Sequence, residues 1–200
     1  QAGICPAGRV TRVEEQYRNL DTRIISGFDF SARYFVNSDY GNFNFIVNIS
    51  KLEKFRQKAG NDFIELIDAQ EKGIIPEELA ITGFSDLIEK DGSPKIQANF
   101  KFLWNKGSWG LGLFGRHIGE FYETRNKLSD GRLWKVKAYN TINTFIDYNF
   151  KISGSQSNLR FGINNIADER APLASDIFGY YIDKHDNLGR SYYINFIHRY

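Results

Sequence analysis

The chain has 200 residues, and its 26 lysines and arginines against 24 aspartates and glutamates exclude the strong basic field of a nucleic-acid binder. Its single cysteine excludes an internal disulfide framework and a cysteine-rich zinc site. No run of about 18 apolar residues can form a membrane-spanning helix, whereas the 3 tryptophans, 11 tyrosines and 17 phenylalanines favour strands with aromatic faces.

The dominant pattern along the chain is the alternation of apolar and polar residues that is expected of strands. In residues 43–50, for example, the odd positions are apolar and the even ones are mostly Asn or Ser. Such faces occur, in chain order, near residues 28–36, 43–50, 96–104, 109–113, 142–150, 159–163 and 192–200. These segments and their flanks predict seven strands of about 9–14 residues, each long enough to cross a bilayer.

Alternation also predicts which side chains share a face of the wall. We expect an apolar set to face lipid: Phe45, Val47, Ile49, Phe100, Phe102, Ile146 and Tyr148. We expect a polar set to face the lumen: Asn44, Asn48, Asn99, Asp147 and Asn149. Aromatic residues near the strand ends, such as Trp104 and Trp109, are typical of the girdle at headgroup depth.

The connections between the predicted strands alternate in length. Short turns near 37–40, 105–107 and 151–156 alternate with long connections over 56–94, 122–136 and 167–189. Short turns at one end and long extracellular loops at the other are typical of outer-membrane barrels. A soluble β-sandwich also alternates apolar and polar residues, but nothing in it requires all long loops at one end. The pattern therefore predicts an all-β fold, a transmembrane antiparallel β-barrel.

Residues 1–20 break this pattern. Arg12 and Glu14 share one side of the stretch and Glu15 lies on the other, and a lipid-facing arginine near the midplane costs about 2–4 kcal/mol. We therefore expect an extracellular loop or extension here, and barrel wall over residues 21–200. Single-chain bacterial barrels have even numbers of strands, so seven strands indicate that this is the C-terminal part of a larger barrel, incomplete on its own.

Three motifs near the two ends of this region carry a family resemblance. Residues 159–172 (LRFGINNIADERAP) resemble the penultimate strand and following loop of TonB-dependent outer-membrane receptors, where G-x-x-N-L-F-D-x-x-P-P is typical. Residues 179–181 (GYY) and 186–200 (DNLGRSYYINFIHRY) resemble that family's ending, and 26–30 (SGFDF) its S-G-V-D-L strand. The chain departs from the pattern at Ala167, His198 and Tyr200.

The resemblance implies a barrel of about 22 strands, of which this chain is the last seven or eight, with an N-terminal plug that is absent from it. It implies uptake of a scarce solute (a siderophore, metal chelate, vitamin or glycan) across the outer membrane of a Gram-negative bacterium. The implied partners are lipid, the plug and N-terminal strands, the TonB complex and the barrel-assembly machinery; nucleic acid and cofactors are not among them. The alternatives are a complete barrel of about eight strands with a structural or adhesin-like role, in which residues 9–18 span, and a soluble β-rich binding domain.

Two sets of aromatic residues are candidate sites. In the long connections, the rings that can stack on a ligand, or pack on one another, are Tyr122, Trp134, Phe178, Tyr180 and Tyr181. In the last strand, an outward row that resembles the family's assembly signal comprises Tyr192, Ile194, Phe196 and Tyr200. Such a row can be recognised when an edge strand is captured by strand addition.

No catalytic or metal site is predicted. No nucleophile, base and orienting group occur together, and the three histidines lie on different elements. Residues 110–115 match the dinucleotide pattern G-x-G-x-x-G, but that pattern requires a helix to follow, and here the glycines lie inside an alternating strand. We expect those on the lumen face to make room for a plug or for a strand bend.

Overall fold

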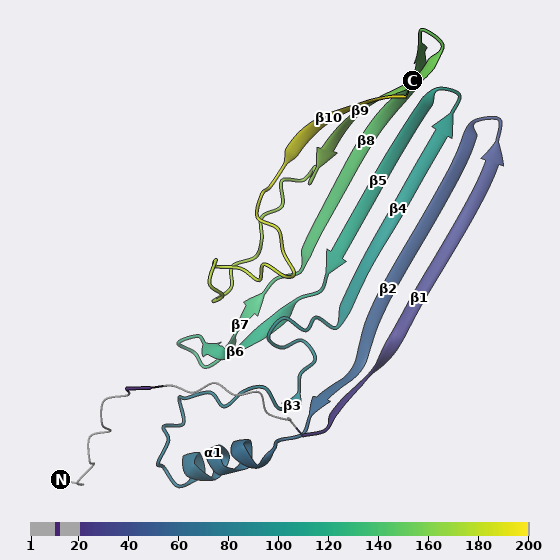
Figure 1. Cartoon of the computed structure of the whole chain (residues 1–200). Helices are drawn as coiled ribbons and strands as arrows, with labels where there is room; N and C mark the ends of the chain where they lie inside the picture. The colour runs from purple at the N-terminus through teal and green to yellow at the C-terminus, as the bar shows by residue number, and fades with distance from the viewer. Residues whose placement is uncertain (1–10, 13–20, 200) are drawn as a thin grey trace.

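A computed structural model of the chain describes residues 11–12 and 21–199 and consists mainly of one large antiparallel sheet (Figure 1). Strands follow one another in the order β1-β2-β4-β5-β8-β9-β10, and the short β3 pairs with β2. Their bounds are β1 (Arg23–Ser38), β2 (Gly41–Gln57), β3 (Ser85–Asp86), β4 (Ile96–Lys106), β5 (Trp109–Ile118), β8 (Tyr139–Ile152), β9 (Ser155–Asn164) and β10 (Ser191–His198). The all-β class is confirmed, and each of the seven predicted strands corresponds to one strand of the sheet.

Three further elements lie in the connections. Helix α1 (Asn61–Glu71) follows β2, and β6 (Phe121–Lys127) pairs with β7 (Leu133–Val136) in a separate two-stranded sheet. The connection expected over 122–136 is therefore mostly a β-hairpin that follows β5 and leads into β8. Within the part of the chain that the structure describes, no helix is both long enough and apolar enough to cross a membrane.

The register places the two predicted sets of side chains on opposite faces of the sheet. On one face Phe45 pairs with Phe102, their ring centroids 4.9 Å apart, and Val47 pairs with Phe100. On the other face Asn48 pairs with Asn99. Because a sheet has period two, this agreement fixes every side chain of the central strands. That the apolar face meets lipid stays a prediction, although its large apolar side chains are exposed in the isolated sheet.

Polar side chains on the other face form hydrogen bonds with one another across the strands. Asn48 Nδ2 donates to Asn99 Oδ1 at 2.8 Å, and its own Oδ1 accepts from Ser31 Oγ at 2.8 Å. Farther along the sheet, Arg160 donates to Asp147 Oδ2 at 2.6 Å, and its guanidinium lies 3.7 Å from the Phe145 ring centroid. The polar face is therefore a network of cross-strand pairs, which hold the register independently of the backbone.

Glycines in the strands of the sheet accommodate side chains from neighbouring strands. A Cβ on Gly112 would lie 2.2 Å from the Phe145 ring, and one on Gly162 would lie 2.1 Å from the Tyr193 ring. Side chains of β8 and β10 thus fill the space above these glycines of the polar face, where we expected room for a plug or for a strand bend. An aromatic ring laid over a strand glycine compensates for the missing side chain.

The two ends of the sheet differ in the length of their connections (Figure 1). At one end lie two-residue turns at 39–40, 107–108 and 153–154, and Trp104 Nε1 donates to the Tyr40 carbonyl at 2.9 Å. At the other end lie the connection 58–95, the β6–β7 hairpin and the loop 165–190, which we together call the loop cap. The N-terminal stretch 1–20, including the alternative eighth strand over 9–18, lies outside the described residues except for residues 11 and 12.

Candidate functional site

The packed core of the described residues lies in and just below the loop cap. Its fully buried apolar side chains are Ile118, Phe121, Val136 and Tyr139. A single-layer sheet leaves both its faces uncovered, whereas here two long connections cover the β6–β7 hairpin and the strand ends that lead to it. The loop cap is therefore the part of the chain with an interior of its own.

The connection 58–95 is tied to the hairpin through Asp91. Its two carboxylate oxygens accept hydrogen bonds from Thr124, Oδ1 from the backbone N–H at 2.9 Å and Oδ2 from the hydroxyl at 2.6 Å. The backbones on either side also pair, because Asp91 N–H donates to the Tyr122 carbonyl at 2.9 Å and Tyr122 N–H donates to the Glu89 carbonyl at 2.8 Å. The hairpin therefore gains a third backbone partner from a segment about 30 residues upstream.

The loop 165–190 is tied to the same hairpin through Glu123. This carboxylate is only 3% exposed, and its Oε1 accepts from Ser175 N–H at 2.8 Å while Oε2 accepts from Asn126 Nδ2 at 3.1 Å. On the other strand of the hairpin, Trp134 Nε1 donates to the Leu173 carbonyl at 3.0 Å. A buried carboxylate needs such partners, because an unpaired charge in the interior is strongly destabilising.

Two rings of the same loop pack on the hairpin. His185 N–H donates to the Tyr181 carbonyl at 2.8 Å, which closes one helical turn and places the two side chains on one face. The Tyr181 ring meets Phe121 edge to face at 5.0 Å between centroids, and the His185 ring stacks on Phe121 at 6.1 Å. Burial first, and the neighbouring carboxylates Glu123 and Asp91 after it, raise the pKa of Tyr181 to about 12, so this phenol stays neutral.

The base of the loop 165–190 is closed by the residues of the motifs. Asp168 Oδ1 accepts from Arg190 N–H at 2.7 Å, and Arg170 Nη1 donates to the Asn187 carbonyl at 3.2 Å. The amide of Asn165 donates to the Glu169 carbonyl at 2.8 Å and accepts from its N–H at 3.0 Å. The Arg190 N–H and the Arg170 charge hold the pKa of Asp168 below its usual value. The two motifs thus clamp together the ends of one loop.

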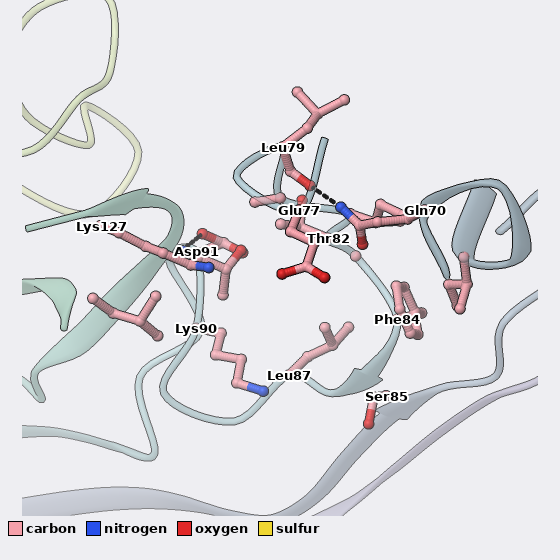
Figure 2. A pocket seen from close by; sticks show the side chains of 16 residues that line it. Gln70, Glu77, Leu79, Thr82, Phe84, Ser85, Leu87, Lys90, Asp91 and Lys127 are labelled. Atoms are coloured by element: carbon pink, nitrogen blue, oxygen red, sulfur yellow. Dashed lines mark hydrogen bonds between the residues drawn. The ribbon is translucent and has the colours of Figure 1, made fainter. Parts of the chain in front are cut away.

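Two hollows open where the hairpin meets its neighbours. The first, of about 380 Å³, lies between the α1 side of the connection 58–95 and the hairpin (Figure 2). Gln70 spans its rim by donating to the carbonyls of Pro76 and Leu79, both at 2.9 Å. It combines apolar walls with a few charges, and its lining includes Leu79, Phe84, Leu87, Lys90, Asp91 and Lys127. Such a mixture of apolar surface and sparse polar groups is typical of small-molecule sites.

The second hollow, of about 620 Å³, lies between the hairpin, the connection 58–95 and the loop 165–190. Its lining is more polar and includes Asp91, Glu123, Arg125, Asn126, Asp176 and Tyr181. Asp91 and Glu123 already accept hydrogen bonds within the cap, whereas Arg125 is exposed. In residues 11–12 and 21–199 no group of three or more His, Cys, Asp or Glu is arranged to hold a metal ion.

The five predicted ligand aromatics are only partly brought together. Tyr122 and Trp134 lie on the hairpin, where Lys135 Nζ is 5.8 Å from the Tyr122 ring. Of the five, Tyr181 lines the larger hollow, Tyr180 is half-buried, and Phe178 is 64% exposed. A role in ligand binding stays a prediction for all of them. Tyr181 and Trp134 also hold the loop on the hairpin, which is the self-packing alternative.

Sequence reasoning did not single out Asp91 or Glu123 as residues that organise the cap, and it did not predict that His185 is buried. In β6 burial alternates, since Phe121 and Glu123 are buried and Tyr122 and Thr124 are half-buried. The sequence does not show this alternation as alternating hydropathy, because one of the two buried side chains is a carboxylate.

The predicted assembly row lies on the apolar face of the last strand. Tyr192, Ile194 and Phe196 are exposed there, and Tyr192 stacks on Phe161 of β9 with ring centroids 6.4 Å apart. Tyr200 lies outside the described residues. That this row serves as an assembly signal stays a prediction.

Comparison with known proteins identifies the family. A family model described as TonB dependent receptor-like, beta-barrel, matches residues 2–166. No curated protein and no solved structure matches the chain significantly. The match ends at residue 166, so the motifs in residues 179–181 and 186–200 lie beyond it. The match covers most of the chain and agrees with the antiparallel sheet, its single-layer wall and its long connections at one end. The chain therefore belongs to the TonB-dependent receptor family, whose members are outer-membrane receptors that transport solutes rather than catalyse reactions.

Proposed function

We propose that this chain forms the C-terminal wall and part of the solute-binding mouth of a receptor for TonB-energised uptake. The observation that carries the proposal is the loop cap, in which two long connections and a hairpin pack into one unit at the end opposite the short turns. Binding sites of membrane barrels are built in such mouths, on loops held by a rigid wall. The solute is a scarce one of the siderophore, metal-chelate, vitamin or glycan classes.

The larger hollow supports binding by hydrogen bonds and charge rather than by apolar contact. Carboxylates, an amide, a phenol and the exposed guanidinium of Arg125 surround it. A solute with several polar groups can exchange its hydration for these fixed partners. The proposed chemistry is binding and gating, with no covalent step.

The proposed partners follow from the two faces and the last strand. The apolar face suits the lipid of a Gram-negative outer membrane, and the polar face suits a plug and the N-terminal strands of the full receptor. Coupling to the TonB complex would come through the N-terminal part of that receptor. The exposed row of Tyr192, Ile194 and Phe196 suits capture by the barrel-assembly machinery.

The test is to identify the solute that co-purifies with the full-length receptor and to remove one cationic partner. We expect Arg125→Ala to reduce the amount of co-purified solute, measured by native mass spectrometry, by about tenfold, as for the loss of one charged hydrogen bond. The matched control is Arg132→Ala, which removes an arginine at the exposed hairpin tip that pairs with Asp130 at 2.7 Å. Both variants should give equal amounts of folded, heat-modifiable barrel.

Equal solute in Arg125→Ala, Arg132→Ala and the wild type would contradict the proposed mouth. Energisation is tested separately, because uptake by intact cells should stop when TonB is absent while binding to those cells persists. Uptake that continues without TonB would show a passive channel instead.

A further inference from the structure

His185 is a buried histidine at the centre of the loop cap. It is 3% exposed, and neither of its ring nitrogens has a hydrogen-bond partner among the described residues. Its ring lies parallel to Phe121, with an interplanar angle of 2°, and meets Tyr139 at an angle of 70° with centroids 5.2 Å apart. An imidazole in such surroundings is held by ring contacts alone.

These contacts hold the loop 167–189 against the β6–β7 hairpin and against the wall. Phe121 belongs to β6 and Tyr139 begins β8, so the His185 ring bridges the loop to both. The Tyr139 hydroxyl donates to the Asp186 carbonyl at 2.6 Å, next to His185 in the chain. Tyr181, one turn earlier, contacts Phe121 from the side. The seat of His185 is therefore where the middle of this long loop is fixed.

The charges around the seat oppose a second positive charge. Arg116 of β5 and Lys184 of the same turn disfavour a protonated ring, while Asp183 favours it. Asp183, however, is 65% exposed and lies 3.3 Å from Lys184. Glu123 of β6 is engaged by Ser175 and Asn126. Burial first, and Arg116 second, hold the pKa of His185 below its usual value of 6.5.

We propose that His185 is an acid-sensitive latch, which holds the loop 167–189 on the β6–β7 hairpin while its ring is neutral and releases the loop when the ring takes a proton. A protonated imidazole needs acceptors for two N–H groups, but the surroundings of His185 are aromatic rings and the positive charge of Arg116. When the ring moves out into water, water molecules accept hydrogen bonds from both N–H groups. The opened loop would uncover the larger hollow, because Tyr181 and Asp176 leave with it.

The direction of the pH effect follows from the lowered pKa of the seated ring. Above the usual histidine pKa of about 6.5 the His185 ring is neutral in both the open and the closed loop, and the closed loop keeps its full stability. Below that pH the ring of the open loop takes a proton before the ring of the closed loop does. The ratio of closed to open loop therefore falls by up to about tenfold per pH unit. The fall ends when the pH reaches the lowered pKa of the seated ring. The latch is thus closed at neutral pH and weakened in mild acid.

The experiment is hydrogen exchange of the full-length receptor at pH 7.5 and 5.5, expressed as protection factors so that the chemical effect of pH is removed. In the wild type, amides of residues 167–189 should lose protection at the lower pH, while those of β8 and β9 keep theirs. His185→Phe preserves a planar ring and cannot titrate, so its loop should be equally protected at both values. His117→Phe is the matched control, because His117 lies in β5 outside the cap and bonds Asn140 at 2.7 Å.

A wild-type loop with constant protection, or a His185→Phe loop that loses protection as the wild type does, would overturn the latch. If the phenyl ring of His185→Phe does not fit and its loop is open at both pH values, the His185 ring of the wild type is titrated by NMR instead. The ¹³C resonance of His185 is the one that is absent from the His185→Phe spectrum. A midpoint clearly below that of a free histidine supports the proposal, and one at or above it overturns the proposal.

Discussion

At the scale of single residues, the glycines of β5 show how the wall is packed. A glycine usually weakens a strand, because it has no side chain to pack. Gly110 and Gly112 lie under Asp147 and Phe145 of the adjacent strand, at distances that leave no room for a Cβ. The Asp147 carboxylate so placed binds Arg160 of the next strand. Small residues here allow polar and aromatic side chains to lie flat along the wall.

This arrangement makes Gly112 a sensitive position. We expect Gly112→Ala to destabilise the folded barrel by about 1–3 kcal/mol, because its methyl group must displace the Phe145 ring. The measurement is the urea midpoint of the heat-modifiable band of the full-length receptor. In a Phe145→Ala background the same substitution should cost much less, since the ring that it meets is gone. Equal costs in the two backgrounds would show that the Phe145 ring is not the cause.

At the scale of elements, the strands of the wall were predictable and the loop cap was not. Strands such as β2 and β4 have one face exposed to lipid or solvent and one polar face, so period two is visible in their residue types. The hairpin strand β6 buries Glu123 beside Phe121, so burial and hydropathy disagree. The contacts that make the cap, such as Asp168 with Arg190, join residues far apart in the chain, and no local pattern reports them.

The division of faces can be tested on β4. In a full-length receptor without other cysteines, and with Cys5→Ser, we expect Asn99→Cys and Lys101→Cys to react with a membrane-impermeant thiol reagent. Phe100→Cys and Phe102→Cys should be spared, because alternate side chains point to opposite faces and lipid covers theirs. These two pairs are matched controls for each other. Labelling of the phenylalanine positions alone would show that the sheet is turned inside out.

At the scale of the whole molecule, the unequal ends of the sheet give it a direction across the membrane. Each long connection joins strands at one end and each short turn at the other (Figure 1). The turns bury little and need few residues, whereas the cap carries helix α1, the β6–β7 hairpin and both hollows. An asymmetric wall of this kind fits a protein that collects a solute on one side only.

This direction can be tested on intact cells. A protease recognition sequence inserted at the hairpin tip near residue 130 should be cut by added protease, because residues 128–132 are exposed at the end of the loop cap. The same sequence inserted at 107–108 should be cut only after the cells are permeabilised. Cutting at 107–108 in intact cells, without cutting near 130, would reverse the topology.

The strand register indicates how far the strands incline to the barrel axis. One row of paired residues crosses the sheet through Asn42, Asn105, Gly110, Asp147 and Arg160. Between this row and its turn, the β1–β2 hairpin has one further residue pair, whereas the β8–β9 hairpin has five. The β4–β5 hairpin also has one further pair, so the change in the position of the turns comes between β5 and β8. Averaged over the strands between, the stagger is about one residue, or 3.3 Å, per strand spacing of about 4.8 Å.

If the short turns lie on average in one plane perpendicular to the barrel axis, a stagger of about 3.3 Å over about 4.8 Å means that the strands are inclined by about 35° to that axis. This is the inclination found in closed outer-membrane barrels. At that inclination about 11 residues cross a hydrocarbon core of about 30 Å. β4 and β5 have 11 and 10 residues, which is close to this length. β1 and β2 have 16 and 17 residues, so we expect this side of the barrel to extend beyond the bilayer next to the proposed mouth.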